Sequence, residues 1–522
     1  MIRGRGCRFM VGVLLAVISL ALVACGAGTG SAGTSSSSKT LRLALGVAPS
    51  TLDPDKFYES EGLVAMTAAY QGLLRYENNS PKLEGLLVTG WKESADGLTY
   101  TFALRHGVKF SDGTPFNAAA AKASFERRTA IKAGPSYMLE EVKSYATPSP
   151  YTFVVHLKRP VAPFLSYLAS PYGPLMTSPT ALAAHTHNGD HAGAWLETHT
   201  EGTGAYAMSS VQHGVKYVMT VNPYYTGAKP YFTRVDFSVV ANFATQLQEV
   251  EGGSLDGVLH GLTTQAIEAA EKNPALQVQE FPALFQAQIW INPKSAVFGA
   301  ANVRTALRAA LNNKQLTEQA YGPTGTPSTN VYPAGMLPNG LAPDESTYNP
   351  SLLAPALAPY KGKKVVIGWS EQSQSENLAN LLQVRLQADG LNASVQQFQP
   401  STFYALPEKP ELRPDMVVIA FNPDSGSPDT FARIYWYKHA PVNLLGCEVP
   451  AADKLLDEAS EQTSEKAAQT IGAKAAIAYR DSNCWLNIAD QKDTIVLRKG
   501  LTGFDHQPAW IYDLSLSSLR EE

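Results

Sequence analysis

Cysteine is scarce in this sequence of 522 residues, which contains Cys7, Cys25, Cys447 and Cys484. None of them belongs to a Cys-x-x-Cys motif, so thiol redox catalysis and a cysteine zinc site are not expected. The sequence also lacks a Gly-Lys-Ser phosphate loop, a Gly-x-Ser-x-Gly elbow and a His-Glu-x-x-His motif. These absences argue against an enzyme, and we expect no catalytic residue and no cofactor. A cell-surface hydrolase would need a catalytic triad assembled from residues scattered along the chain.

The sequence also lacks a large excess of positive or negative charge. The sequence has 42 Lys and Arg residues against 46 Asp and Glu residues, a formal net charge of -4. Such a balance does not suggest a nucleic-acid partner. There is no internal repeat. The length, together with a hydrophobic content of 44%, favours two or more globular domains.

The N-terminus has the pattern of a secretion signal. Arg3, Arg5 and Arg8 precede an almost unbroken apolar run over residues 9–23. This run is marginal for a bilayer span, which needs about 20 residues. The Leu-Val-Ala sequence before Cys25 resembles the bacterial lipobox, and the resemblance implies cleavage before Cys25 and lipidation of its thiol. A plain signal peptide cut near residue 24 and an uncleaved anchor are the alternatives.

The expected mature chain begins with a tether. Residues 26–38 are nearly all Gly, Ser, Thr and Ala, a composition typical of a flexible segment. We therefore expect a signal peptide at residues 1–24, and the lipidated cysteine with its tether at residues 25–38. The lipid would hold the protein on the extracytoplasmic face of the cell membrane. In that oxidising compartment Cys447 and Cys484 are expected to form a disulfide; two buried free thiols are the alternative.

Alternating apolar and polar residues predict strands in several parts of the chain. These strands are expected at residues 40–46, 98–110, 151–157, 285–292 and 494–498, with two more within residues 216–240. Helical spacing predicts a helix at residues 63–74, a second that Asn117 caps, and others at residues 452–460 and 465–480. A further helix has a single apolar face that consists of Val303, Ala306, Leu307, Ala310 and Leu311.

Residues 364–420 show strand and helix patterns in alternation. A short apolar strand at residues 365–368 is followed by a helix that Ser375 would cap and Gly390 would end. Strands at residues 393–398 and 416–420 follow. The order strand, helix, strand predicts a βαβ unit and hence a parallel sheet. The proline-rich stretches at residues 323–343 and 350–359 are interpreted as surface linkers.

Several short motifs, in a fixed order, resemble those of the extracellular solute-binding proteins, family 5, the dipeptide, oligopeptide and nickel-binding proteins of ABC importers. They cover most of the chain from residue 41 to residue 504. The matching motifs begin at Thr51, Gln71, Asp96, Leu104, Ser111, Gly202, Asn222 and Val303. The motifs at Thr51 (Thr-Leu-Asp-Pro), Ser111 (Ser-Asp-Gly-Thr-Pro-Phe) and Asn222 (Asn-Pro-Tyr-Tyr) are examples.

The resemblance implies an α/β fold of two lobes joined by a hinge, similar to the type II periplasmic binding proteins of cluster C. The first lobe would comprise residues 39–282 and be completed by residues 491–522. The second lobe would comprise residues 283–490. Residues 285–292 and a stretch near residues 488–497 would be the hinge strands, and a ligand would be enclosed when the lobes close.

The resemblance also implies one ligand-binding residue. Asp424 follows an apolar strand in the second lobe, where peptide-binding members of the family place the aspartate that holds the peptide amine. A carboxylate in a closed cleft would form a strong charge-assisted bond with an ammonium group. Here Ser425 and Gly426 replace the family's usual aromatic residue and proline. The alternative role of Asp424 is to cap its own turn.

Aromatic residues near this position are candidates for the wall of the cleft. They are Phe403, Tyr404, Tyr435 and Trp436 in the second lobe, and Tyr58 in the first. Core packing is the alternative for each of them.

A histidine cluster lies in a Gly- and Ala-rich stretch of the first lobe. His185, His187, His191 and His199 occur within fifteen positions. Imidazoles at this density can bind zinc, nickel or copper, but the spacing matches neither a helical nor a Cys-x-x-Cys pattern. We interpret the stretch as an exposed loop and expect no metal site.

The resulting prediction is a monomeric, lipid-anchored substrate-binding protein of an ABC importer. It would capture a short peptide or another small solute and deliver it to the permease subunits. The alternative is a lipoprotein of the same fold that has lost transport and acts as a regulator or scaffold in cell-envelope synthesis.

Overall fold

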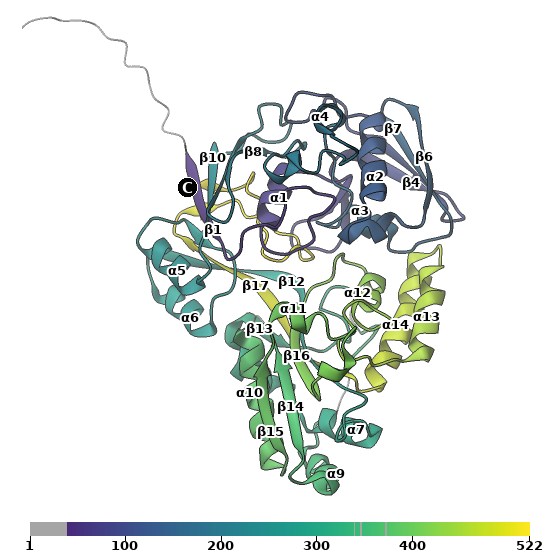
Figure 1. The fold of residues 1–522 in the computed structure, drawn as a ribbon, viewed down its shortest axis with the longest axis vertical. Coiled ribbons are helices and arrows are strands. Elements are labelled where there is room, and N and C mark those ends of the chain that lie inside the picture. Colours follow the sequence, from purple (N-terminus) through teal and green to yellow (C-terminus); the bar gives the residue numbers. More distant parts are fainter. Residues whose placement is uncertain (1–38, 339, 345–346, 371–372) are drawn as a thin grey trace, which may run out of the picture. The chain divides into compact units, whose positions relative to one another are not determined.

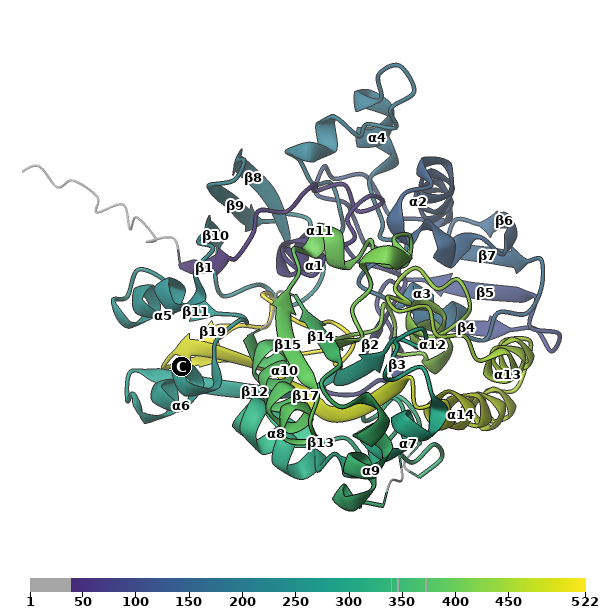
Figure 2. The same ribbon diagram turned by 60° about the horizontal axis from the view of Figure 1, so that its bottom comes forward.

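Two long strands organise the fold. The computed structural model describes residues 39–338, 340–344, 347–370 and 373–522 (Figure 1). Strand β12 (Leu276–Ile291) pairs antiparallel with β17 (Trp485–Arg498), and the two lie side by side in Figures 1 and 2. We call the chain before β12 and after β17 the first lobe, and the chain between them the second lobe. The predicted signal peptide, the lipidation at Cys25 and the tether lie outside the described residues.

One mixed sheet of 11 strands runs through both lobes. Strand β16 (Met416–Phe421) pairs with one end of β12, between Gln286 and Ile291. Strand β11 (Gly257–Val258) pairs with Leu497 and Val496 at the opposite end of the ladder. Strands β12 and β17 therefore carry the sheet from one lobe to the other, at the place predicted for the hinge strands.

The first lobe continues this sheet in the order β11, β1, β10, β9, β8. Strand β1 is parallel to β10, and β9 and β8 are antiparallel to their neighbours. The predicted alternation is confirmed in β1, where Leu41, Leu43 and Leu45 are buried. The strand bounds are β1 (Thr40–Leu45), β8 (Tyr206–Gln212), β9 (Lys216–Val221) and β10 (Arg234–Val239).

The second lobe contains the predicted βαβ unit. Strand β14 (Lys364–Trp369), helix α10 (Ser373–Ala388) and strand β15 (Asn392–Gln397) follow one another, and β14 is parallel to both β15 and β16. Because α10 begins at Ser373, the prediction that Ser375 caps it is wrong. Gly390 follows the helix at a φ of 95°, in the left-handed region where glycine is favoured.

Helix α7 confirms the predicted apolar stripe of the second lobe. It spans Ala301–Ala310, and its buried residues are Val303, Ala306, Leu307 and Ala310. These side chains pack in a core with residues of β12, β14 and β16. The 3.6-residue period of the stripe thus identified both the helix and its buried face.

A separate antiparallel sheet has the strand order β4, β5, β7, β6. Its strands are β4 (Val88–Glu93), β5 (Thr99–Leu104), β6 (Val142–Ser149) and β7 (Thr152–Leu157). Helix α2 (Ala118–Ile131) packs against β6 and β7 (Figures 1 and 2). The side chain of Asn117 accepts a hydrogen bond from the backbone N–H of Ala120, which confirms the predicted N-cap.

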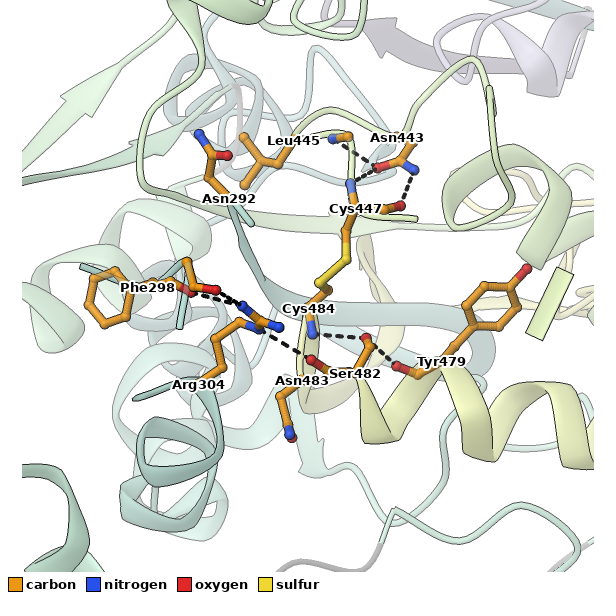
Figure 3. The surroundings of a disulfide bond; sticks show 12 residues. Asn292, Phe298, Arg304, Asn443, Leu445, Cys447, Tyr479, Ser482, Asn483 and Cys484 are labelled. Atoms are coloured by element: carbon orange, nitrogen blue, oxygen red, sulfur yellow. Dashed lines mark hydrogen bonds between the residues drawn. A yellow bond between two sulfur atoms is a disulfide. The ribbon is translucent and has the colours of Figure 1, made fainter. Parts of the chain in front are cut away.

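The predicted disulfide between Cys447 and Cys484 is present (Figure 3). It joins the loop before helix α13 (Pro450–Ser460) to the residue before β17. The backbone N–H of Cys447 donates to the side-chain oxygen of Asn443, and that of Cys484 donates to the Ser482 hydroxyl. Both ends of the bridge are therefore anchored by local hydrogen bonds.

The proline-rich stretches are not surface linkers, and this prediction is wrong. Val331, Tyr332 and Met336 are buried in a core that also contains residues of β16 and β17. Leu353 and Leu357 are buried in the other core of the second lobe, together with residues of α7 and β14. Because these apolar side chains cover the sheet, the segments are part of the core although their prolines prevent long helices.

The remaining elements are short or flank the sheets. In the first lobe they are α1 (Leu63–Ala69), β2 (Leu74–Tyr76), β3 (Leu83–Gly85), η1 (Gly134–Leu139), α3 (Phe164–Leu168), α4 (Pro179–His185), η2 (Trp195–Glu197), α5 (Phe243–Glu251), α6 (Thr264–Lys272), β18 (Leu501–Thr502) and β19 (Arg520–Glu521). In the second lobe they are α8 (Asn313–Tyr321), η3 (Gly322–Thr324), β13 (Gly325–Pro327), η4 (Pro350–Leu352), α9 (Leu353–Leu357), η5 (Ala358–Tyr360), α11 (Pro400–Phe403), η6 (Pro410–Leu412), α12 (Pro428–Tyr435) and α14 (Glu465–Asp481). Within the described part of the chain, no helix combines the length and apolar character that a membrane span requires.

Candidate functional site

Asp424 lies at the carboxyl end of strand β16. Every residue of β16 is buried, and Asn422 and Pro423 lead from the strand to Asp424. In open α/β sheets, ligands bind beyond the carboxyl ends of the strands. The side chain of Asp424 is itself almost fully buried, with 7% of the residue exposed.

The carboxylate of Asp424 receives hydrogen bonds from the first lobe. The hydroxyl groups of Tyr58 and Tyr137 both donate to Oδ2, the latter at 2.7 Å. Tyr58 lies in the loop before α1, and Tyr137 lies in η1. Asp424 therefore faces the first lobe, where a ligand enclosed between the lobes would lie.

The charge of Asp424 has no cationic partner in the part of the chain that the structure describes. Among the described residues, no Lys, Arg or His side chain forms an ion pair with it, whereas buried Asp429 pairs with Arg433 at 2.9 Å and buried Asp55 pairs with Arg128 at 2.9 Å. Burial raises the pKa of Asp424, and the two tyrosine hydrogen bonds lower it in part. The site can thus accept a positively charged group from outside the protein.

The two tyrosine donors stay protonated. Burial raises the pKa of Tyr58 and of Tyr137 above the ordinary value, and the negative charge of Asp424 raises both further. Both hydroxyls donate to Oδ2. Among the described side chains, none donates to Oδ1.

Aromatic rings surround the carboxylate. The ring of Tyr172 packs edge-on against Tyr58, with centroids 5.2 Å apart. Tyr435 donates its hydroxyl to the carbonyl oxygen of Asn422 at 2.6 Å and packs on Phe421, with centroids 4.0 Å apart. Burial and then the charge of Asp424 raise the pKa of Tyr435. The arrangement is an apolar wall with one acidic group.

The other predicted aromatic residues lie in different surroundings. Tyr404 is 48% exposed, whereas Phe403 is buried and packs against Phe398. Trp436 is buried beside Tyr332, Tyr479 and Trp485 in the core of the second lobe. The structure thus brings Tyr58 and Tyr435 to Asp424, while Phe403 and Trp436 pack in the core.

Sequence reasoning missed four residues of this region. Tyr137 lies in the short 3-10 helix η1, and Tyr172 and Ser170 lie in an irregular segment; the hydroxyl of Ser170 donates to the carbonyl oxygen of Asp424. Tyr76 ends a three-residue strand. The Ser-Pro-Tyr sequence that begins at Ser170 is a turn signal, but it gives no indication of a partner 254 positions away.

Two cavities lie outside this site. One, of about 80 Å³, is enclosed by the first lobe and the C-terminal segment, and Thr67, Ser170, Trp510 and Asp513 are among the residues that line it. The other lies at the surface between α6 and β12 and is lined by Glu271, Lys499 and neighbouring residues. Asp424 lines neither of them.

Two residues of the histidine cluster, His185 and His199, stack on a tryptophan. The ring of Trp195 lies between those of His185 and His199, with centroids 4.1 Å and 4.5 Å apart and nearly parallel planes. Among the residues that the structure describes, no group of three or more His, Cys, Asp or Glu side chains is arranged to hold a metal ion. His185 and His199 thus pack against an indole ring.

Comparison with known proteins identifies the family. The model of the bacterial extracellular solute-binding proteins, family 5, matches residues 82–441, more than half of the chain. The chain belongs to this family. Among curated proteins, one relative is the Escherichia coli K12 protein named "Probable D,D-dipeptide-binding periplasmic protein DdpA". It is 25% identical to this chain over 479 residues, and the match covers 89% of this chain and 92% of that protein. This chain is also 30% identical over 303 residues to the glutathione-binding protein GsiB of Escherichia coli O1:K1, which covers 57% of this chain and 56% of GsiB.

Solved structures confirm the predicted mixed α/β, two-lobed fold of the periplasmic binding proteins. DppA of Helicobacter pylori in complex with the peptide STSA matches with a TM-score of 0.78 and 21% identity, over 92% of this chain and 98% of that one. NikA of Brucella suis in complex with Fe(III)-EDTA matches with a TM-score of 0.81 and 20% identity, over 92% of this chain and 100% of that one. Proteins with this fold therefore bind chemically different ligands, and the ligand of this family 5 protein has to be inferred from its own site.

Proposed function

We propose that this protein is the substrate-binding lipoprotein of an ABC importer and that it captures a short peptide between its lobes. The observation that carries the proposal is the buried, unbalanced carboxylate of Asp424, which faces the first lobe. A peptide with a free amino terminus would supply the missing positive charge. The names of the related proteins, which refer to dipeptides and glutathione, support this ligand class.

The geometry suggests how the amine is held. The ammonium group of the peptide would donate to Oδ1 of Asp424, while Tyr58 and Tyr137 continue to donate to Oδ2. Tyr435 and Tyr172 would cover the apolar part of the first residue. Because the site lies between the lobes, the peptide would be enclosed by closure about β12 and β17.

The first experiment measures whether a pool of tripeptides raises the melting temperature of the purified protein. The second measures the affinities for trialanine and N-acetyl-trialanine by calorimetric titration. Trialanine is expected to bind at least tenfold more tightly than its acetylated form, because acetylation removes the positive charge. In Asp424→Asn this preference should disappear. Asp389→Asn is the matched control, because Asp389 follows α10 and forms its ion pair with Arg385 of that helix, away from Asp424. Absence of any shift with the whole pool would contradict peptide capture and would favour the regulatory alternative.

Anchoring at the membrane is a second part of the proposal. It is supported by the basic residues, the apolar run and the Leu-Val-Ala-Cys25 sequence at the N-terminus. In a bacterial host, the wild-type protein is expected in the membrane fraction and should be labelled by a radioactive fatty acid. Cys25→Ala should abolish the label, and a label that persists in this variant would contradict lipidation at Cys25.

A further inference from the structure

The loop that carries Asp424 is also held through its main chain. Ser170, which follows α3, donates its hydroxyl to the carbonyl oxygen of Asp424. Two residues further along, the backbone N–H of Gly426 donates to the hydroxyl of Tyr76 at 2.7 Å. Both partners belong to the first lobe. The two bonds do not involve the carboxylate, so a ligand amine does not compete for them.

The hydroxyl of Tyr76 is fixed in the orientation that accepts this bond. Tyr76 is 0% exposed, and its hydroxyl donates to the carbonyl oxygen of Ser166 at 3.3 Å while it accepts from Gly426. Burial raises the pKa of Tyr76 to about 12, so the group remains a neutral hydroxyl. The backbone N–H of Tyr76 donates to the side-chain oxygen of Gln507, which holds the residue in place.

Gly426 is suited to this contact by its size. A Cβ atom at position 426 would lie 3.0 Å from Cε1 of Tyr76 and 3.2 Å from its Cζ and hydroxyl oxygen. A side chain at this position would require the phenol ring to shift by a few tenths of an ångström, because the ring approaches the backbone closely. The position also needs a backbone N–H for the bond to Tyr76. Glycine meets both conditions at this position, whereas the family's usual proline has no N–H to donate.

We propose that Tyr76 and Ser170 are positioning residues that latch the main chain of residues 424–426 to the first lobe in the closed state. The inference rests on the proposed function, because closure matters only if a ligand is enclosed. Asp424 would select the charge of the ligand, whereas the latch would set how long any ligand stays enclosed. The two roles can be separated by experiment.

The test compares Tyr76→Phe with wild type and with Tyr321→Phe. Tyr76→Phe removes one hydroxyl and leaves the Gly426 N–H without its partner. Tyr321→Phe is the matched control, because Tyr321 is also fully buried and its hydroxyl has no hydrogen-bond partner among the described residues. Ser170→Ala removes the second bond of the latch.

The first measurement needs no ligand. Hydrogen exchange of the peptide that contains Gly426 is expected to be at least fivefold faster in Tyr76→Phe than in wild type, and unchanged in Tyr321→Phe. The second measurement is stopped-flow dissociation. Trialanine and N-acetyl-trialanine should both leave Tyr76→Phe at least fivefold faster, by the same factor for each.

The outcomes distinguish the two proposals. Unchanged exchange in Tyr76→Phe overturns the latch, whether or not a peptide binds. Faster dissociation of trialanine alone also overturns it, because the residue would then act on the amine. Failure of wild type to bind any peptide, with faster exchange in Tyr76→Phe, contradicts peptide capture and leaves the lobe-to-lobe latch supported.

Discussion

Opening the disulfide provides a quantitative test of the structure of the second lobe. Cys447 and Cys484 are 37 positions apart, and the loop that they close contains the helical hairpin of α13 and α14. The loop-entropy relation predicts that the bridge stabilises the folded state by about 4 kcal/mol at 25 °C, because it restricts the unfolded chain. Both cysteines are buried, with 5% and 1% of each residue exposed, so a reductant reaches them only when this region opens.

The experiment compares three forms of the protein: oxidised wild type, wild type reduced under denaturing conditions and refolded in reductant, and the double variant Cys447→Ala/Cys484→Ala. The difference between the first two isolates the cross-link, since the sulfur atoms remain. The difference between the last two reports lost packing. Urea unfolding can be followed by the fluorescence of the seven tryptophans, of which Trp436 and Trp485 lie in the same core, with ring centroids 6.0 Å apart.

Reduction is expected to lower the free energy of unfolding of the tryptophan-reported transition by about 4 kcal/mol with little change of its denaturant slope. A loss below about 1 kcal/mol would refute the loop-entropy reasoning for this bridge.

Three further predictions concern stability. Arg128→Met, which removes one of the two guanidinium groups that pair with buried Asp55 (Arg128 at 2.9 Å and Arg127 at 2.5 Å), should lower the free energy of unfolding in urea by roughly 3 kcal/mol. Burial raises the pKa of Asp490 from 3.8 to about 7, so between these two pH values the folded state keeps a proton that the unfolded state has released. The contribution of this group to stability is therefore complete below the unfolded-state pKa. It falls by at most roughly 1.4 kcal/mol per pH unit as the pH rises toward about 7. Asp490→Asn should therefore flatten the melting-temperature profile between pH 4 and pH 7 relative to wild type. Asn117→Ala should cost about 1 kcal/mol in the same urea assay, whereas Asn117→Ser should be nearly neutral.

Local patterns predicted the elements of this fold well where one physical rule dominates. Alternation located β1 and β7, helical spacing located α7, and a polar side chain before a helical run located the cap at Asn117. The disulfide was predicted from the expected compartment and the even number of cysteines left in the mature chain. Each of these signals is contained within a few residues or in the composition.

The prediction failed where burial depends on distant partners. The segment around Tyr332 was interpreted as a linker because of its prolines, yet its apolar side chains cover the sheet of the second lobe. The aromatic candidates were similar in sequence context, but Trp436 packs in the core while Tyr435 reaches Asn422 near Asp424. Periodicity cannot separate such cases, because the deciding contacts join residues far apart in the chain.

The contacts of Asp424 illustrate why the site could be predicted only in part. Asp424 was implied by the family resemblance, but its partners Tyr58 and Tyr137 lie 366 and 287 positions away. Hydroxyl groups supply hydrogen bonds without supplying charge, so they stabilise the carboxylate less than the guanidinium groups that serve Asp55 and Asp429. A buried carboxylate paired by a cation of its own lobe needs nothing from a ligand. A buried carboxylate that only hydroxyls of the opposite lobe reach gains most when an ammonium group is enclosed with it, and this difference singles out Asp424 among these three buried aspartates as the one suited to bind a ligand.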